Sequence, residues 1–323
     1  MEMKSNKFKD SILLYLKGIS MGAADVVPGV SGGTMAFILG IYEELIHSIH
    51  TVTSFETIKR ALKLDFKYMK ELPWKFLLTL GAGIFSSIIL LAKLIQFMLL
   101  NYPEMLWGFF FGLVAASIFT VIDRVNSWNI KSYVSLVLGT VFAFLVISIV
   151  PTETPNNPFF LFLCGAIAIC AMILPGISGS FLLVILGKYK YILSALTTSI
   201  TALKELNLSL FVDNVLVLVY VGFGAIFGLG SFVKLLDVLF KKFHDLTVAT
   251  LIGFMMGSLW KIWPWKEVVS TYTDRHGVLK PLVEKNIFPS IDSGFFITIA
   301  LMVFAFVLIV SIDKIVRKKT IED

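Results

Sequence analysis

The stretch VVPGVSGGTMAFILG, residues 26–40, returns later in the chain as ILPGISGSFLLVILG, residues 173–187. Proline lacks an amide hydrogen and glycine readily adopts positive φ angles, so both residues interrupt helices. In each copy these breakers, together with hydroxyl side chains, stand directly before an apolar run. The two copies therefore predict a helix that is broken in the same way at two places in one fold.

The composition predicts an integral membrane protein. Of 323 residues, 57% are hydrophobic and only 15% are charged, with a mean hydropathy of +0.86. Soluble domains carry about a quarter charged residues. Segments of roughly 20 apolar residues are long enough to cross a bilayer. Six segments approach or exceed that length: 76–100, 103–122, 132–151, 214–233, 246–263 and 294–312.

The net charge of +6 is distributed as a membrane topology would require, and we expect no nucleic-acid partner. Lys and Arg gather at the N-terminus, in 59–75, at 124–131, at 241–242 and in 314–319, whereas the short loops 101–104 and 151–158 contain neither. Cytoplasmic loops carry the excess of basic residues in membrane proteins. Both termini are therefore predicted to be cytoplasmic.

The whole chain reads as two copies of one unit. Eight of twenty positions are identical between residues 27–46 and 174–193, and the spaced glycines Gly108–Gly112 return as Gly253–Gly257. The first repeat covers 1–151, with a Pro-Gly hairpin at 11–49 and the helices 76–100, 103–122 and 132–151. The second covers 152–323, with a hairpin at 159–196 and the helices 214–233, 246–263 and 294–312.

Three crossings per unit make the second unit enter from the opposite face, so the repeats are predicted to be inverted within one membrane domain. The fold class is therefore an all-α integral membrane protein of two inverted-topology repeats, each a re-entrant or broken helical hairpin plus three transmembrane helices. Whether the hairpins span or re-enter stays open. Non-helical backbone at membrane depth needs protein or water around it, so both turns are expected in the protein interior.

A helix that begins after PGxSG presents free backbone amides and the positive end of its dipole, which together favour an anion. Two such starts meeting at mid-membrane would bind a phosphate-like group. The candidate residues are Ser31, Gly32, Gly33, Thr34, Ser178, Gly179 and Ser180. The alternative is that these small residues only permit close helix packing. We favour that alternative for Gly108–Gly112 and Gly253–Gly257, which lack hydroxyls and breakers.

Charged residues within a membrane are costly and usually functional, and three are candidates for such a role: Asp25, Lys93 and Lys234. Asp25 precedes the first turn, and its repeat counterpart is Met172. This asymmetry suggests that Asp25 couples transport to a proton or cation. An equally good interpretation is that its carboxylate caps backbone amides around the turn. Lys93 and Lys234 occupy matching positions and would supply positive charge to an anion, although both are close enough to a helix end to snorkel.

Other chemistry has little support. GVSGG at 29–33 fits the G-x-S-x-G elbow of hydrolases, but that motif needs a preceding strand and a His–Asp pair. The four histidines offer no evident partner at depth, and the two cysteines are too few for a metal site. We expect no metal and no cofactor.

DVVPGVSGGTMAFILGIYEELI and its partner ILPGISGSFLLVILGKYKYIL closely resemble the PopT-type undecaprenyl-phosphate translocase family, a former domain-of-unknown-function family of bacterial membrane proteins. The resemblance spans essentially the whole chain. It implies a flippase that returns undecaprenyl phosphate across the bacterial cytoplasmic membrane for cell-wall synthesis, with the polyprenyl-phosphate headgroup on the turn residues. The chain would be a transporter rather than an enzyme.

Two other functions remain open from the residues alone. Undecaprenyl-diphosphate phosphatases of the inverted-repeat type also have PGxS turns, but they follow the serine with an arginine, where this chain has Gly32 and Gly179. Phosphoryl transfer would then lack its charge-stabilising donor. A channel or exchanger for an inorganic anion would also use paired helix starts.

Overall fold

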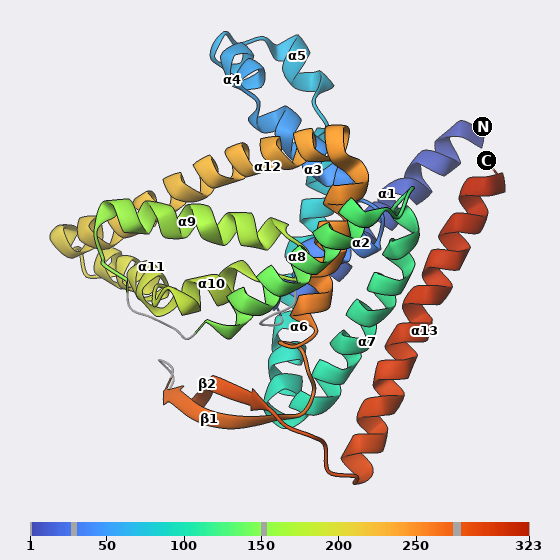
Figure 1. Cartoon of the computed structure of the whole chain (residues 1–323). Coiled ribbons are helices and arrows are strands. Elements are labelled where there is room, and N and C mark those ends of the chain that lie inside the picture. Colours follow the sequence, from blue (N-terminus) through green and yellow to red (C-terminus); the bar gives the residue numbers. More distant parts are fainter. Residues whose placement is uncertain (1, 27–30, 150–153, 274–278, 323) are drawn as a thin grey trace.

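The computed structural model describes residues 2–26, 31–149, 154–273 and 279–322 (Figure 1). Long helices dominate, with one short β-hairpin near the C-terminus. In chain order the elements are α1 Glu2–Val26, α2 Gly32–Ile38, α3 Tyr42–Thr53, α4 Phe55–Leu62, α5 Phe66–Glu71, α6 Trp74–Asn101, α7 Pro103–Val121, the 3-10 turn η1 Ile122–Arg124, α8 Ile130–Ser148, α9 Pro158–Ile173, α10 Gly179–Ile185, α11 Tyr189–Lys204, α12 Leu208–Ser258, β1 Lys266–Thr273, β2 Leu279–Asn286 and α13 Ser293–Glu322.

Among the described residues, five helices are long and apolar enough to cross a membrane: α6, α7, α8, α12 and α13. A sixth span results if the bent pair α10 and α11 is counted as one. The segments predicted at 76–100, 103–122 and 294–312 are therefore confirmed as helices. The segment 132–151 is confirmed as far as Ser148, and its last two residues lie outside the described residues. The protein is a multi-pass membrane protein.

The structure has two helices where 214–233 and 246–263 were predicted, and they are joined across a kink within the 51-residue α12. The kink is at Phe243, with φ −138° and ψ 47°, and the second helix ends at Ser258, before the predicted end at 263. The charges around the break explain its position. Lys241 and Lys242 precede it and Asp245 follows it, which suits the negative end of one helix dipole and the positive end of the next. The two predicted helices are therefore joined by a bend at Phe243.

The all-α prediction is wrong in one place, the segment between the helices predicted at 246–263 and 294–312. Its residues form an antiparallel hairpin in which β1 pairs with β2 from Lys266–Asn286 to Thr273–Leu279. The strand sequence KEVVSTYT is rich in β-branched and aromatic residues, which pack well on a pleated surface. The chain is mostly helical, with this hairpin joining α12 to α13 (Figure 1).

Each predicted Pro-Gly hairpin contains three helices instead of two. Gly40 separates α2 from α3, and Gly187 separates α10 from α11; their φ angles are +71° and +66°. A side chain is strained at such angles, whereas glycine is not. The axes of α10 and α11 differ by 102°. In each hairpin the part that follows the PGxSG turn is therefore broken into two helices, α2 and α3 in the first and α10 and α11 in the second.

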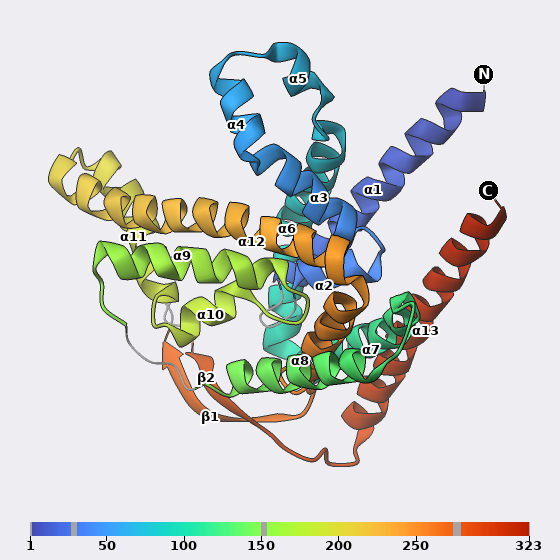
Figure 2. The same cartoon turned by 45° about the horizontal axis from the view of Figure 1, so that its top comes forward.

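Helices from the two halves pack in a reciprocal pattern. In the first half α1 packs on α6 and in the second α9 packs on α12; across the halves, α7 packs on α13 and α8 on the later part of α12 (Figures 1 and 2). Glycine makes the cross-half contacts possible. A Cβ at Gly112 would overlap the Met302 carbonyl, and one at Gly253 would overlap the Leu136 carbonyl. These glycines serve close packing, as predicted.

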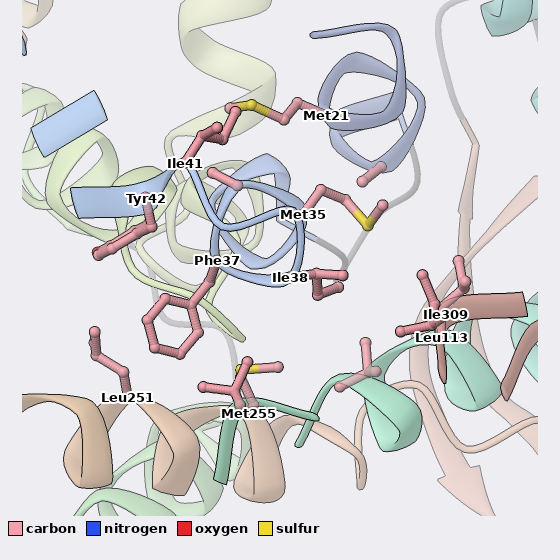
Figure 3. Packing of buried hydrophobic residues seen from close by; sticks show 14 of the residues in the cluster. Met21, Met35, Phe37, Ile38, Ile41, Tyr42, Leu113, Leu251, Met255 and Ile309 are labelled. Atoms are coloured by element: carbon pink, nitrogen blue, oxygen red, sulfur yellow. The ribbon is translucent and has the colours of Figure 1, made fainter. Parts of the chain in front are cut away.

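The short helix α2 lies at the centre of the core, with all seven of its residues buried. Phe37 points from α2 toward Leu251 and Met255 of α12 (Figure 3). Its ring also meets that of Tyr42 edge to face, at 5.2 Å between centroids. The helix start that follows the first turn is therefore interior, as predicted. The turn residues 27–30 themselves lie outside the described residues.

Candidate functional site

The start of α2 lies directly against the second Pro-Gly turn. The hydroxyl of Thr34 accepts a hydrogen bond of 2.8 Å from the amide of Gly176. The hydroxyl of Ser31 lies 3.2 Å from the carbonyl oxygen of Met172 and 3.3 Å from that of Leu174, to which it donates. Ser31 and Thr34 are each only 2% exposed. The structure thus brings two predicted site residues of the first copy onto the turn of the second.

The first amides of α2 already have acceptors. Asp25, at the end of α1, accepts a hydrogen bond of 2.7 Å from the Gly32 amide through Oδ1. The Ser31 hydroxyl accepts from the Gly33 amide at 3.1 Å. A carboxylate therefore occupies the position at which an anion would meet this helix start. Asp25 therefore caps the Gly32 amide in this structure, as one of the two interpretations of this residue requires.

The start of α10 is arranged differently. Ser178 precedes the helix without a side-chain cap, and its hydroxyl lies 3.0 Å from that of Ser180. Ser178 is buried, whereas Ser180 is exposed. The Ser180 side chain is therefore accessible from outside the core, unlike the buried side chains of Ser31 and Thr34. The two helix starts are therefore equivalent in sequence and different in access.

Both starts rest on α9 through glycine. A Cβ at Gly33 would overlap the carbonyl oxygen of Ile173, and a Cβ at Gly179 would overlap that of Ala168. Gly33 and Gly179 are thus required for close packing on α9, which is the alternative role considered for the small residues of both turns. The chemistry open to a ligand comes from backbone amides and from hydroxyls.

Of the two candidate lysines, the one that the structure describes fully, Lys234, is not brought to these turns. Lys93 lies on α6, and its side chain is outside the described residues. Lys234 is exposed on α12, and no hydrogen bond or ion pair in the described part of the chain joins it to either helix start. Instead Lys17 of α1 reaches the other end of α2, where its Nζ donates to the Leu39 carbonyl at 2.9 Å. A cation is stabilised there by the helix dipole.

Sequence reasoning missed a second charged cluster, because its members lie far apart in the chain. Two of the histidines without evident partners, His47 and His50 on α3, each place Nδ1 3.2 Å from a carboxylate oxygen of Asp237 on α12. Lys241 donates to the same carboxylate at 2.6 Å. The cluster fastens α3 to α12 next to the bend. In the described ranges, no group of three or more His, Cys, Asp or Glu could hold a metal ion.

Comparisons with known proteins agree with the motifs. The family model described as VCA0040-like, undecaprenyl phosphate translocase-like, matches residues 21–280. The chain is 37% identical over 324 residues to a polyprenyl-phosphate transporter of Vibrio cholerae serotype O1, covering 97% of this chain and all of that protein. It is 30% identical over 262 residues to a polyprenyl-phosphate transporter of Staphylococcus aureus, covering 77% of this chain and 85% of that protein.

No solved structure matches the chain significantly. The family match covers most of the sequence, including both Pro-Gly turns and every candidate site residue. The resemblance found in the two motifs is therefore confirmed, and the chain belongs to the undecaprenyl phosphate translocase-like family.

Proposed function

We propose that this protein is a flippase that returns undecaprenyl phosphate across the bacterial cytoplasmic membrane for reuse in cell-wall polymer synthesis. Both similar proteins are named polyprenyl-phosphate transporters. The observation that carries the proposal is the buried polar contact between the two turns, Thr34 with Gly176, inside a multi-pass membrane protein. Polar groups inside a membrane protein are costly and are often functional.

The phosphate headgroup would bind at the starts of α2 and α10. On the first side the groups are Ser31, Gly32, Gly33 and Thr34, and on the second Ser178, Gly179 and Ser180. Because Ser180 is the exposed residue among these, the headgroup meets Ser180 first and then its neighbour Ser178. It reaches α2 only when Asp25 leaves the Gly32 amide, since a carboxylate and a phosphate cannot share one donor.

This competition offers a means of coupling transport to protons. A protonated Asp25 accepts hydrogen bonds more weakly than the carboxylate does, so it would release Gly32 to the phosphate. The uncharged acid would also no longer repel the headgroup. Proton movement would then accompany each passage of the lipid phosphate. Sodium or another cation that neutralises Asp25 would act in the same way.

Alternating access would come from rocking one inverted repeat against the other. The packing of α1 on α6 and of α9 on α12 supports a repeated unit in the two halves. Gly83 of α6 meets α1 at the Tyr15 carbonyl, and Gly224 of α12 meets α9 at the Phe162 carbonyl. Corresponding helices in the two halves thus use corresponding glycines. The polar headgroup would cross through the interior while the isoprenoid tail remains in lipid, with both termini cytoplasmic.

A reconstituted assay tests the proposal. Liposomes containing the purified protein should expose undecaprenyl phosphate from the inner leaflet to a membrane-impermeant phosphatase added outside. Changing Ser178 and Ser180 together to alanine should slow this exposure about tenfold or more, since each hydrogen bond to a charged group contributes roughly 1.5–3 kcal/mol. Ser231→Ala, which loses only a bond to its own helix, should leave the rate unchanged.

Two results would replace the proposal by another function. Release of inorganic phosphate from undecaprenyl diphosphate would identify a phosphatase. Flux of inorganic phosphate or another small anion through liposomes, without movement of the lipid, would identify a channel or exchanger. Wild-type protein that leaves undecaprenyl phosphate in its original leaflet would refute the flippase itself.

A further inference from the structure

A groove of about 500 Å³ lies on the inner side of the bend in α12. Residues from both sides of Phe243 line it, among them Leu239 and Leu246, and α8 contributes Phe142. Leu174, the residue before the second Pro-Gly turn, closes one part of its wall. Since both halves of α12 face the same space, the bend at Phe243 creates the groove.

The groove offers a ligand almost no polar partner. Its only polar side chains are Thr247 and Thr250, and both hydroxyls donate within α12, to the carbonyls of Phe243 at 2.9 Å and Leu246 at 2.8 Å. The remaining lining residues are leucines and phenylalanines. An occupant of the groove must therefore be apolar.

The groove is continuous with the second turn. Leu174 lines it with its side chain, while its carbonyl oxygen accepts the hydrogen bond from Ser31. A Cβ at Gly176 would lie 2.6 Å from the carbonyl oxygen of Phe254, another lining residue. A lipid whose phosphate lies at the starts of α2 and α10 would have its first tail atoms beside Leu174.

We propose that this groove binds the isoprenoid tail of the transported polyprenyl phosphate, an inference that rests on the proposed function. The volume falls within the roughly 300–1,000 Å³ typical of ligand pockets, so the groove would hold the headgroup-proximal part of the tail and leave the rest in lipid. Its position next to the headgroup residues would let one lipid bind through its phosphate and its tail at the same time.

Filling the groove tests this inference. Leu239→Trp should slow the movement of undecaprenyl phosphate in liposomes about tenfold or more, because losing contacts of even a methylene or two costs roughly that factor. Farnesyl phosphate, whose short tail makes fewer contacts, should be affected much less. Leu235→Trp is the matched control, since Leu235 is on the same helix but is 51% exposed and outside the groove. Unchanged movement of undecaprenyl phosphate in Leu239→Trp would overturn the inference.

A second measurement uses unmodified protein and separates this inference from the proposed function. Undecaprenyl phosphate with a photoreactive group in its first isoprene units should crosslink to α12 between Phe232 and Phe254, and to Leu174. An excess of unlabelled undecaprenyl phosphate should abolish the crosslink, and an excess of phosphatidylglycerol should not. Equal competition by phosphatidylglycerol would assign the groove to bulk lipid. Groove crosslinks without transport would refute the flippase and leave the tail site standing.

Discussion

The hydroxyl of Thr34 accepts the amide hydrogen of Gly176 at 2.8 Å, across 142 residues of sequence. Both residues are buried. Gly176 has φ +84°, in the region where a side chain is strained, so the second turn can present this amide because it has glycine there. The contact ties the helix start of one repeat to the turn of the other, and the two motifs form one structural unit.

Thr34→Val should destabilise the protein. Valine keeps the shape of threonine but cannot accept a hydrogen bond, so the buried Gly176 amide is left unpaired, at a cost of about 1–3 kcal/mol. Thermal unfolding in detergent should show the loss, and Thr34→Ser should restore most of it. Thr197→Val is the control, because that hydroxyl bonds only to carbonyls of its own helix. Equal melting of Thr34→Val and wild type would contradict the role of this contact.

Alanine in place of glycine should separate the packing glycines from the dispensable ones. A Cβ at Gly33 or Gly179 overlaps a backbone carbonyl of α9, whereas nothing lies within 4 Å of a Cβ at Gly81 or Gly222. Gly33→Ala and Gly179→Ala should lower the melting temperature and the transport rate. Gly81→Ala and Gly222→Ala should be neutral or stabilise by roughly 0.5–1 kcal/mol, since alanine favours helix interiors. If all four variants changed the melting temperature alike, helix propensity rather than packing would determine the effect of alanine.

The sequence was sufficient for the features that depend on composition and local spacing. Apolar runs of membrane length became helices, and the repeated Pro-Gly turn lies in the interior wherever it is described. The breaks at Gly40 and Gly187 could also have been found, because both glycines are among the eight identities of the repeat. They were missed because glycine within an apolar run also suits a packed transmembrane helix.

Other features required the tertiary structure. The shared partner of His47 and His50 is Asp237, about 190 residues away, and periodicity gives no information about such a pair. The capping of Gly32 by Asp25 depends on how the chain turns between them. The β-hairpin was overlooked because a polar segment between two transmembrane helices is compatible with either a loop or a pair of strands.

Lys266, on β1 outside the membrane-spanning helices, should give stability a dependence on pH. Its side chain is 6% exposed, with Nζ 3.5 Å from a Glu284 oxygen and 3.9 Å from the centre of the Trp107 ring. Burial lowers the pKa of Lys266 from 10.5 to about 8, against the opposing effect of Glu284. Between these two values the unfolded chain binds more protons than the folded one, so stability rises as the pH increases.

The measurement is the midpoint of thermal unfolding in detergent at several pH values between these two pKa values. Lys266→Met should flatten the rise, because methionine occupies a similar volume without a titrating group. Lys285→Met, at an exposed position on β2, should retain the wild-type profile. A rise of the same size in Lys266→Met would assign the pH dependence to another group.

Asp25→Asn should remove the pH dependence of transport. In the wild type, lower pH favours the protonated acid, which releases the Gly32 amide to the phosphate, so the rate of lipid movement in liposomes should increase as the pH falls. Asparagine can still accept from Gly32 through its amide oxygen, but it carries no charge at any pH. The variant should therefore transport at a rate that varies little with pH. Asp292→Asn is the matched control, because Asp292 caps the start of α13 through the Phe295 amide in the same way. A pH profile unchanged by Asp25→Asn would limit Asp25 to capping α2, and the coupling group would then lie elsewhere.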